Sequence, residues 1–503
     1  MGLRSRLPRL LTCATAAAAL AWLVTWGGSA YSATTFTVDT TTDAVDANPG
    51  DGTCATAAGQ CSLRAAIQEA NALPGSHSIT LPSGTYTVTI GGQPEDASAN
   101  GSFDINGDLE IHGDGSSSTV IDGAYVDTLI RVLSGKVVIS DVTLEHGGPP
   151  PVALQGAEGD IANSGDLTLN NSVISGGQAS DGAGISNTGT LTVNGSTITG
   201  NVARQTPQPE GARGGGIFNL GGNMTLADVT ISDNRAGQGG GIYSIGTASL
   251  TNVTVSQNDA FETAAGIVAQ GDIMLTNVTI SGNRVSMDAG GMFHFGVGTA
   301  RLTNVSISDN NSRYGTGGII GERVVLKNTI LSSNGNGNCE AVVTSEGHNL
   351  EDTDTCGLNS PGDLRNTDPN LGPLAANGGP TETHALLPGS PAIDAGNSNC
   401  PPPATDQRGV LRPQDGDGNG TAKCDIGAYE LQPTQPTPTV EPPSPTPADS
   451  LAASPVASVA ALPRTGGAPG ANQEAIVASL WIGGLLIAFG MTSLFLGFRR
   501  RPW

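Results

Sequence analysis

Aromatic and basic residues are both scarce in this chain. Aromatic residues make up only 4% of the 503 residues, and the four tryptophans lie near the two ends, at Trp22, Trp26, Trp481 and Trp503. The long region between them has no tryptophan, which argues against a sugar-binding module that stacks sugar rings on indole. The chain carries 22 Lys and Arg against 45 Asp and Glu. We do not expect so acidic a protein to bind nucleic acid or anionic lipid.

Sequence signals of common catalytic sites are absent as well. The histidines between residues 101 and 338 are His112, His146 and His294, and none has Ser or Cys as a sequence neighbour. No Cys and His residues show zinc-site spacing, and the glycines do not form a phosphate-binding or dinucleotide-binding motif. No helical period occurs from residue 111 to residue 334. We therefore predict no organic cofactor.

A repeated phrase dominates the chain. "LTNVTISGN" (Leu275 to Asn283) returns as "LTNVTVSQN" and "LTNVSISDN", with apolar and polar residues alternating as in a β-strand. Successive phrases begin 24 to 33 residues apart. The apolar residues that open the phrases are Ile111, Ile139, Leu169, Val193, Leu226, Leu250, Leu275, Leu302 and Leu326. A period of about two dozen residues with several short strands predicts a coil of a parallel β-helix over residues 101–338.

Two columns of asparagine follow this period. The first column is Asn252, Asn277, Asn304 and Asn328, with Asp228 in the same place one phrase earlier, and the second is Asn201, Asn234, Asn258, Asn283, Asn310 and Asn334. Coils stack at ~4.8 Å, so side-chain amides can bond along the axis, and Asn tolerates left-handed corners. We interpret both columns as structural ladders. The alternative is a row of polar groups that bind a ligand.

Cysteine pairing follows sequence proximity. Six cysteines remain once Cys13 is set aside with the signal described below, and they fall into local couples. The simplest of the possible connectivities pairs Cys54 with Cys61, Cys339 with Cys356, and Cys400 with Cys424. Disulfides at these positions would suit an extracellular compartment.

The two ends of the chain look like export and anchoring signals. Residues 1–33 have an arginine-rich start, an apolar run and small residues, as in a secretory signal peptide. Near the other end, "LPRTG" precedes an apolar stretch over residues 476–498, long enough for a membrane helix, and a closing run of arginines. Residues 462–503 thus resemble an LPXTG cell-wall sorting signal. The alternative is a plain C-terminal membrane anchor.

The sorting-signal resemblance implies specific partners and roles. A sortase would recognise Leu462, Pro463, Thr465 and Gly466. It would cut after Thr465 and join that residue to peptidoglycan, after the apolar helix had held the protein in the membrane. The protein would then be extracellular and attached to the cell wall or cell surface. The proline-rich residues 432–461 would form a stalk beneath it.

Two further segments resemble parts of bacterial surface proteins. "CSLRAAIQEAN" (Cys61 to Asn71) resembles the CSLREA-type segment at the start of surface β-helix proteins, with Ala65 in place of the usual glutamate. It implies an N-terminal cap over residues 34–100 with a short helix. "NTDPNLGPLAANGGP" and "CDIGAYE", within residues 366–430, resemble the choice-of-anchor Q domain. That resemblance implies a disulfide-bearing C-terminal cap domain over residues 339–431.

Only weak candidates for chemistry remain. Asp233 and Asp309 share one place in the repeat but would stand ~14 Å apart, too far for a pair of hydrolytic carboxyl groups. Arg235 and Arg284 are the candidate bases for a lyase. "DGDGNG" sets Asp415, Asp417 and Asn419 at the first positions of a calcium loop, although the usual glutamate at position twelve is missing. Any calcium here would be structural.

The sequence as a whole predicts an all-β protein, a right-handed parallel β-helix of the pectin lyase-like type. It would have an N-terminal helical cap, a C-terminal disulfide-bearing domain, a proline-rich stalk and one transmembrane helix. We expect a wall-anchored surface protein that displays its β-helix for adhesion or envelope structure. The first alternative is a lyase or hydrolase of acidic polysaccharides, and the second is a non-catalytic carbohydrate-binding protein, with a polysaccharide or another cell surface as partner.

Overall fold

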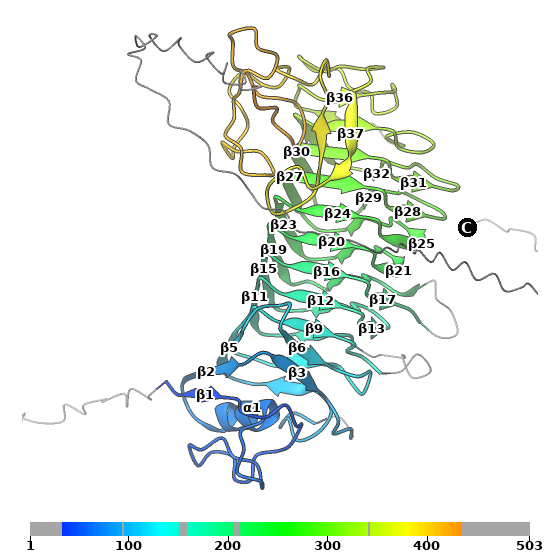
Figure 1. Ribbon diagram of the computed structural model, residues 1–503. Helices are drawn as coiled ribbons and strands as arrows, with labels where there is room; N and C mark the ends of the chain where they lie inside the picture. The colour runs from blue at the N-terminus through cyan, green and yellow to red at the C-terminus, as the bar shows by residue number, and fades with distance from the viewer. Residues whose placement is uncertain (1–32, 93–94, 150–157, 206–210, 341–342, 434–503) are drawn as a thin grey trace, which may run out of the picture. The chain divides into compact units, whose positions relative to one another are not determined.

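The computed structural model describes residues 33–433, except 93–94, 150–157, 206–210 and 341–342 (Figure 1). Nearly all of the predicted signal peptide and stalk, and all of the sorting signal at residues 462–503, lie outside these residues. Within them, no helix is long and apolar enough to cross a membrane. All the described residues belong to one compact unit, Met1–Pro436.

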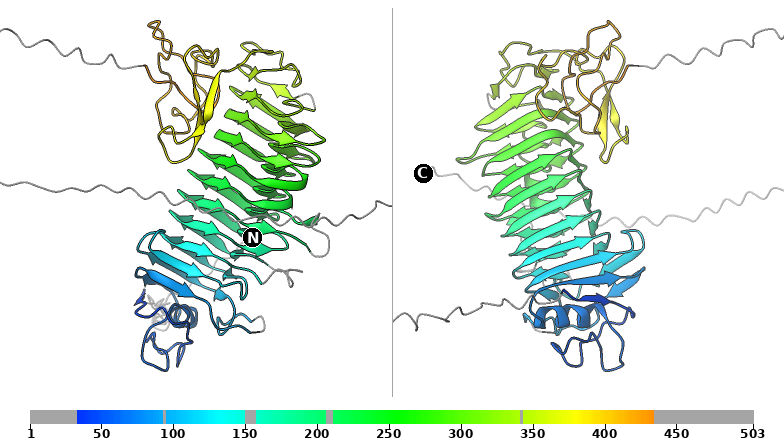
Figure 2. Two further views of the ribbon diagram at one scale, coloured as in Figure 1. Left: turned by 45° about the vertical axis from the view of Figure 1, so that its right-hand side comes forward. Right: turned by 90° about the vertical axis from the view of Figure 1, so that its left-hand side faces the viewer.

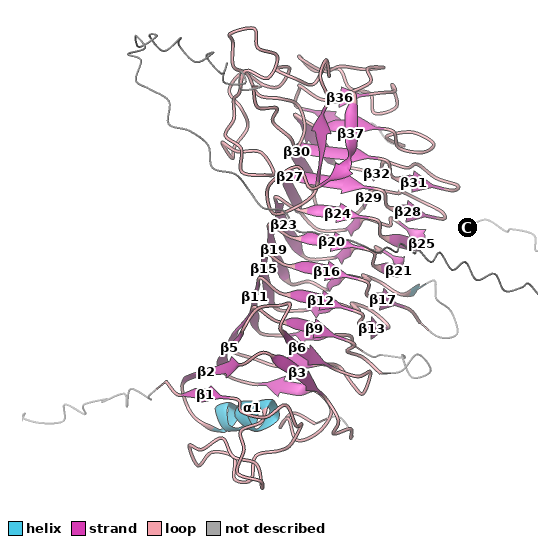
Figure 3. Ribbon diagram, in the orientation of Figure 1, coloured by secondary structure: helices cyan, strands magenta, loops and turns pink. Residues whose placement is uncertain are grey.

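Short parallel strands build this unit, and they stack in four columns that we call faces 1 to 4 (Figure 3). One coil shows the pattern: β19 (Asn223–Ala227), β20 (Thr230–Ser232), β21 (Arg235–Gln238) and β22 (Ile242–Ser244) lie on faces 1, 2, 3 and 4 in that order. Each strand bonds to its counterparts in the coils before and after it. Strand pairing between coils thus satisfies the backbone groups that a single coil would leave unpaired.

Faces 1 and 2 form one 21-stranded sheet, because β27 (Ile273–Ser281) and β30 (Ala300–Ser308) run through both. The other strands of face 1 are β1 (Thr35–Thr37), β2 (Ser76–Leu81), β5 (Asp108–Gly113), β8 (Lys136–Ser140), β11 (Asp166–Asn170), β15 (Thr190–Asn194), β23 (Thr247–Thr251), β33 (Val324–Lys327) and β35 (Thr344–Ser345). Those of face 2 are β3 (Gly84–Thr87), β6 (Thr119–Asp122), β9 (Thr143–Glu145), β12 (Val173–Ser175), β16 (Thr197–Thr199), β24 (Thr254–Ser256), β34 (Ile330–Ser332) and β36 (Leu350–Glu351).

Faces 3 and 4 are separate sheets of 6 and 9 strands. Face 3 also contains β13 (Gln178–Ala179), β17 (Val202–Ala203), β25 (Asp259–Thr263), β28 (Arg284–Val285) and β31 (Asn311–Ser312). Face 4 also contains β4 (Phe103–Ile105), β7 (Ile130–Val132), β10 (Ile161–Asn163), β14 (Ile185–Asn187), β18 (Ile217–Asn219), β26 (Ile267–Ala269), β29 (Met292–His294) and β32 (Ile319–Gly321).

The register of face 1 confirms the predicted repeat. The residues that open the phrases pair in sequence from Ile111 through Leu275 to Leu326, and each is at most 1% exposed. They form one apolar column inside the coils. Ile79 of β2 extends the column by one more coil, so strand pairing begins before the predicted start at residue 101.

The N-terminal end carries the one helix in the described part of the chain, α1 (Leu63–Ala72), which packs against β2 and β4 (Figure 1). Ser62 caps it by accepting a hydrogen bond from the Ala65 amide. Its apolar residues Leu63, Ala66, Ile67 and Ala70 are buried, and Arg64 is buried too. Its guanidinium pairs with Asp43 at 2.6 Å and lies over the Phe103 ring.

The C-terminal region differs from the predicted cap. β35 and β36 continue faces 1 and 2 beyond residue 338, and a hairpin of β37 (Leu371–Ala375) and β38 (Thr383–Leu386) follows. Figure 2 shows the segment from this hairpin onward lying beside the coils, along face 2, where the sequence had predicted a cap over the end of the stack. The structure contains the disulfides Cys54–Cys61, Cys339–Cys356 and Cys400–Cys424, as predicted.

Candidate functional site

The first asparagine column forms the corners between faces 1 and 2. Asn252, Asn277, Asn304 and Asn328 all have left-handed backbone angles, with φ between 53° and 57°. Their side-chain amides bond from coil to coil: Asn277 donates to Asn252 at 3.2 Å, Asn304 to Asn277 at 3.1 Å and Asn328 to Asn304 at 2.9 Å. These residues make the tight corner and link the coils along the axis.

The same column also holds the C-terminal segment, which we call the docked domain (residues 366–431). Besides their ladder bonds, Asn277 donates from Nδ2 to the Thr405 carbonyl at 2.9 Å, and Asn328 donates to the Asp425 carbonyl at 2.8 Å. The backbone oxygen of Asn252 accepts from the Thr381 hydroxyl at 3.1 Å. The column is therefore a structural ladder. It also binds polar groups, as the alternative interpretation required, but these groups belong to another segment of the same chain.

A row of hydroxyl groups on face 2 completes the contact with the docked domain. Gln407 is fully buried there, and its Nε2 donates to the Thr254 hydroxyl at 2.8 Å while its Oε1 accepts from the Thr279 hydroxyl at 2.7 Å. Ser306, the next residue in the row, accepts from the Ala428 amide at 3.1 Å. The Gln407 side chain thus forms hydrogen bonds with hydroxyl groups of two successive coils.

One serine and histidine pair lies in this interface. Ser281 Oγ is 2.9 Å from His384 Nε2, and His384 Nδ1 is 2.8 Å from the Gly372 carbonyl oxygen, which it reaches as a donor. This arrangement resembles a nucleophile with its base. Both residues are only 2% exposed, so a substrate cannot reach them. Sequence inspection missed the pair because the two residues are 103 positions apart. We interpret the pair as a docking contact.

The second asparagine column is buried between faces 2 and 3. Asn258 shows its bonding: Oδ1 accepts from the Asn234 amide at 3.0 Å, and Nδ2 donates to the Ile231 carbonyl at 3.0 Å and to Asn283 Oδ1 at 3.0 Å. Asn234, Asn283 and Asn310 repeat this pattern. The column is fully enclosed, so it cannot serve as a binding row for an external ligand.

In the earlier coils, Gly147 and Gly177 occupy the positions of this asparagine column. There the Asp160 side chain, like the asparagines, accepts a hydrogen bond from a backbone amide. Its carboxylate is fully buried, and Oδ1 accepts from the Gly147 amide at 2.6 Å. Burial raises the pKa of Asp160 well above its ordinary value, with repulsion from Glu145 as a smaller cause.

The predicted catalytic candidates do not converge. Asp233 and Asp309 are corner residues with φ of 57° and 60°, and they lie in different coils with Gln257 and Gly282 in the coils between them. Arg235 lies on the exposed side of face 3, with its guanidinium 3.5 Å from the Asp259 carboxylate.

Arg284, the second candidate base, is the other register neighbour of Asp259. These charges alternate along face 3, with the single carboxylate of Asp259 between the two arginines in the described register.

A carboxylate from elsewhere in the chain, that of Asp394, lies beside the predicted calcium loop. Asp394, Asp415 and Asp417 bring carboxylate oxygens within 4.8 Å of one another. Asn419 instead donates from Nδ2 to Asp417 at 2.7 Å, and the Asp415 carboxylate accepts from the Gly420 amide. Asp394 was not foreseen, because it lies 23 positions before Asp417. The group offers the all-oxygen donor set that calcium prefers.

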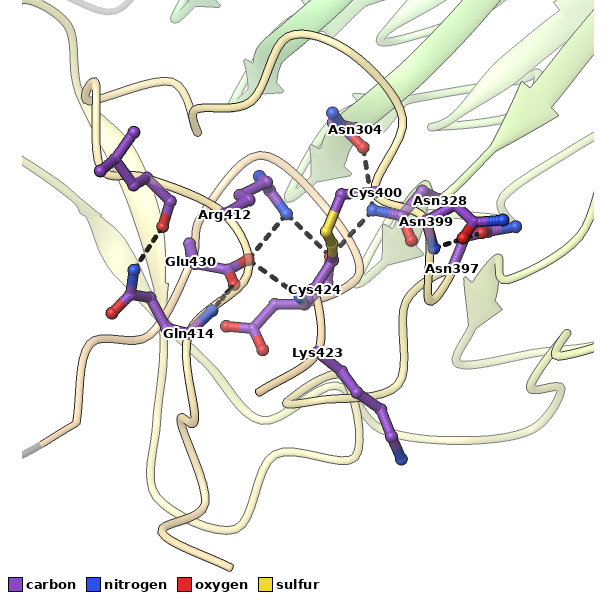
Figure 4. Close-up of a disulfide and its surroundings, with 12 residues drawn as sticks. Asn304, Asn328, Asn397, Asn399, Cys400, Arg412, Gln414, Lys423, Cys424 and Glu430 are labelled. Carbon is purple, nitrogen blue, oxygen red and sulfur yellow. Dashed lines mark hydrogen bonds and ion pairs between the residues drawn. A yellow bond between two sulfur atoms is a disulfide. The ribbon is translucent and has the colours of Figure 1, made fainter. Parts of the chain in front are cut away.

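A buried network of charges holds the docked domain together, beside its disulfide (Figure 4). Arg412 pairs with Glu430 at 3.0 Å, and both side chains are fully enclosed. Burial raises the pKa of Asp425 to about 7, and the Glu430 carboxylate adds to that rise. Burial likewise raises the pKa of Glu430 and lowers that of Arg412. The domain thus contains acid groups whose charged forms are disfavoured by their surroundings.

An open groove lies on the outer side of face 1, away from the docked domain. Its volume is about 460 Å³, and it spans β19, β23, β27 and the start of β30. The lining includes Asn223, Thr225, Ser249, Met274 and Arg301. Met274 is 51% exposed, and the Arg301 guanidinium forms an exposed ion pair with Glu346 at 3.2 Å. Asp272 lines the groove as well, so the groove offers hydroxyl, amide, carboxylate and guanidinium groups around a thioether. Sequence inspection missed it because these residues are ordinary outward positions of the repeat.

Comparison with known proteins agrees with the fold. Residues 109–285 match the family model described as "Right handed beta helix region". No curated protein and no solved structure matches the chain. The matched region covers most of the coils, including β19, β23 and β27 of the groove. This fold occurs both in surface proteins and in polysaccharide-degrading enzymes.

Proposed function

We propose that this β-helix is a secreted, wall-anchored surface protein and that the groove on face 1 is its contact surface for a polysaccharide. The observation that carries the binding role is the groove itself, a concave surface of about 460 Å³ built from several successive coils. Ligand sites are usually concave, with a few placed polar groups that fix orientation. Face 2 is occupied by the docked domain over its later coils, which leaves face 1 as the accessible broad face.

The chemistry of the groove favours a hydroxylated ligand. Thr225, Ser249 and Asn223 can exchange hydrogen bonds with sugar hydroxyls, and Arg301 can pair with a carboxylate or sulfate. The lining contains no aromatic ring, so binding would rest on hydrogen bonds and charge. The partner would be a polysaccharide of the envelope or of another cell surface.

Anchoring is proposed from the sequence. The predicted signal peptide, the choice-of-anchor Q resemblance of residues 366–430 and the LPRTG sequence follow one another along the chain in the order that export, display and sortase attachment require. Sortase and peptidoglycan would be the partners at this end.

Fractionation of a sortase-positive host that expresses the full chain tests the anchoring. The wild type should appear in the wall fraction, and Pro463→Ala should accumulate in the membrane. Release of both forms into the medium would refute it.

Binding is tested by titrating purified full-length protein with acidic and neutral polysaccharides in solution. Arg301→Ala should weaken binding of acidic polymers about tenfold, the loss of roughly one charge-assisted contact. Arg284→Ala removes an exposed arginine from face 3 and is the matched control. Equal weakening by both substitutions would show that the net charge, and not the groove, determines binding.

A further inference from the structure

Three side chains that could hold a metal meet at one corner of face 2, in the early coils. Asp122 ends β6, Glu145 ends β9, and the two residues pair in register. His146 follows Glu145 at a left-handed corner with φ of 57°. Its Nδ1 lies 3.1 Å from Asp122 Oδ1 and 3.9 Å from Glu145 Oε1. One donor atom from each of the three residues lies within 4.8 Å of the other two.

These residues depart from the repeat that surrounds them. In the seven coils that follow, the strand position of Asp122 and Glu145 carries a hydroxyl residue: Ser175, Thr199, Ser232, Ser256, Ser281, Ser308 and Ser332. Fold maintenance therefore does not require a carboxylate there. Two like charges directly opposite each other on neighbouring strands are destabilising. A bound cation would remove that cost.

The surroundings hold the three donors in place. The Asp122 carboxylate accepts from the Ala124 amide at 2.9 Å, and the Tyr125 ring packs against the His146 ring at 5.0 Å. Behind the corner, Asp160 accepts from the Gly147 amide, while its Oδ2 has no hydrogen-bond partner among the described residues. The Asp160 carboxylate is fully buried, so the corner has an additional acidic group on its inner side.

The distances and donor types identify the class of ion. Zinc bonds of ~2.0 to 2.2 Å to nitrogen and oxygen place neighbouring ligand atoms roughly 3 to 3.5 Å apart. The observed separations of 3.1 and 3.9 Å are close to this range. An imidazole ligand suits zinc and other transition metals, whereas calcium prefers oxygen alone. The side chains remain 22% to 40% exposed, so water or a partner group could complete the coordination.

We propose that Asp122, Glu145 and His146 form a binding site for a divalent transition-metal ion of the zinc type. The site lies on face 2, apart from the groove on face 1 and from the all-oxygen group at Asp394. It does not depend on the proposed polysaccharide binding.

Equilibrium dialysis of chelator-treated full-length protein against zinc tests this proposal. Wild-type protein should bind one equivalent more tightly than either His146→Asn or Glu145→Gln, by at least about tenfold. Calcium in excess should not displace that equivalent. His112→Asn is the matched control, because His112 pairs with only one carboxylate, Glu110, at 3.2 Å. Cobalt, used in place of zinc, should give an absorption band that both site variants lose.

The thermal transition of each variant shows whether it is folded. Glu145→Gln keeps the size of the side chain, so it gives an answer even if His146→Asn fails to fold. The proposal is overturned if folded Glu145→Gln retains wild-type zinc affinity, or if His112→Asn loses as much affinity as the site variants.

Discussion

At the scale of single residues, buried amides matter more than the apolar repeat alone suggests. Asn258 satisfies the Asn234 amide and the Ile231 carbonyl inside the coil. Asn258→Ala would leave the buried Asn234 amide without this partner and would remove the side-chain bond to the Ile231 carbonyl, which costs about 3 kcal/mol of unfolding free energy in sum. Denaturant unfolding followed by circular dichroism measures the loss.

Asn194→Ala is the control for that substitution, because the Asn194 amide lies on the outer side of face 1 and bonds only to Asn170 Oδ1, at 3.0 Å. We expect it to cost under about 1 kcal/mol. If Asn258→Ala and Asn194→Ala unfolded at the same denaturant concentration, the interpretation of the inner column as a structural ladder would be wrong.

Titration of buried acids is a second effect at this scale. The pKa values of Asp425, about 7, and Asp104, about 6, are both raised by burial. The folded protein therefore holds protons that the unfolded chain releases above about pH 4. This contribution to stability is complete below that pH and is lost as the pH rises through about 6 for Asp104 and about 7 for Asp425.

We accordingly expect the unfolding free energy to fall between about pH 4 and about pH 7, over the range set by these raised pKa values. Asp425→Asn should flatten the upper part of that slope, because the neutral amide does not titrate. A stability that rises with pH across this interval, or an unchanged slope in Asp425→Asn, would contradict the assignment.

At the scale of elements, the docked domain is held on face 2 by polar groups that belong to the repeat. Gln407 joins Thr254 and Thr279, and Asn277 donates to the Thr405 carbonyl. We expect Gln407→Ala to loosen this domain without unfolding the coils. Hydrogen exchange followed by mass spectrometry should then show faster exchange in residues 366–431 and unchanged exchange in β15 and β19.

Asn277→Asp provides a second version of that test, which removes the donor to the docked domain together with the ladder bond to Asn252 Oδ1. The carboxylate can keep the left-handed corner but cannot donate to the Thr405 carbonyl. The same exchange pattern should appear. Faster exchange throughout the coils would mean that the domain and the coils unfold together, which would contradict the account of a separately docked domain.

Sequence reasoning succeeded and failed at this scale for physical reasons. Each coil repeats the same local requirements, so Leu275 and its equivalents predicted the stack and its register. The docked domain depends on contacts between residues about 128 positions apart, such as Thr279 with Gln407, and no local pattern records them. Asp394 and His384 were missed for the same reason. The corner at His146 was visible as a departure from the repeat, although its meaning required the register of Asp122 with Glu145.

At the scale of the whole molecule, the C-terminal segment covers face 2 of the β-helix over its later coils, while face 1 carries the open groove. Export and wall attachment would be directed by the ends of the chain, at residues 1–33 and 462–503, which lie outside the described structure. The central claim is that the free face binds a polysaccharide and does not cleave it.

The most direct measurement is to incubate full-length protein with acidic and neutral polysaccharides, with and without calcium. Bound polymer, new reducing ends and unsaturated-uronate absorbance are followed in the same samples. We expect saturable binding of a polysaccharide, weakened by Arg301→Ala, with no product. Product that accumulates with time would contradict the display account and would establish the lyase or hydrolase alternative.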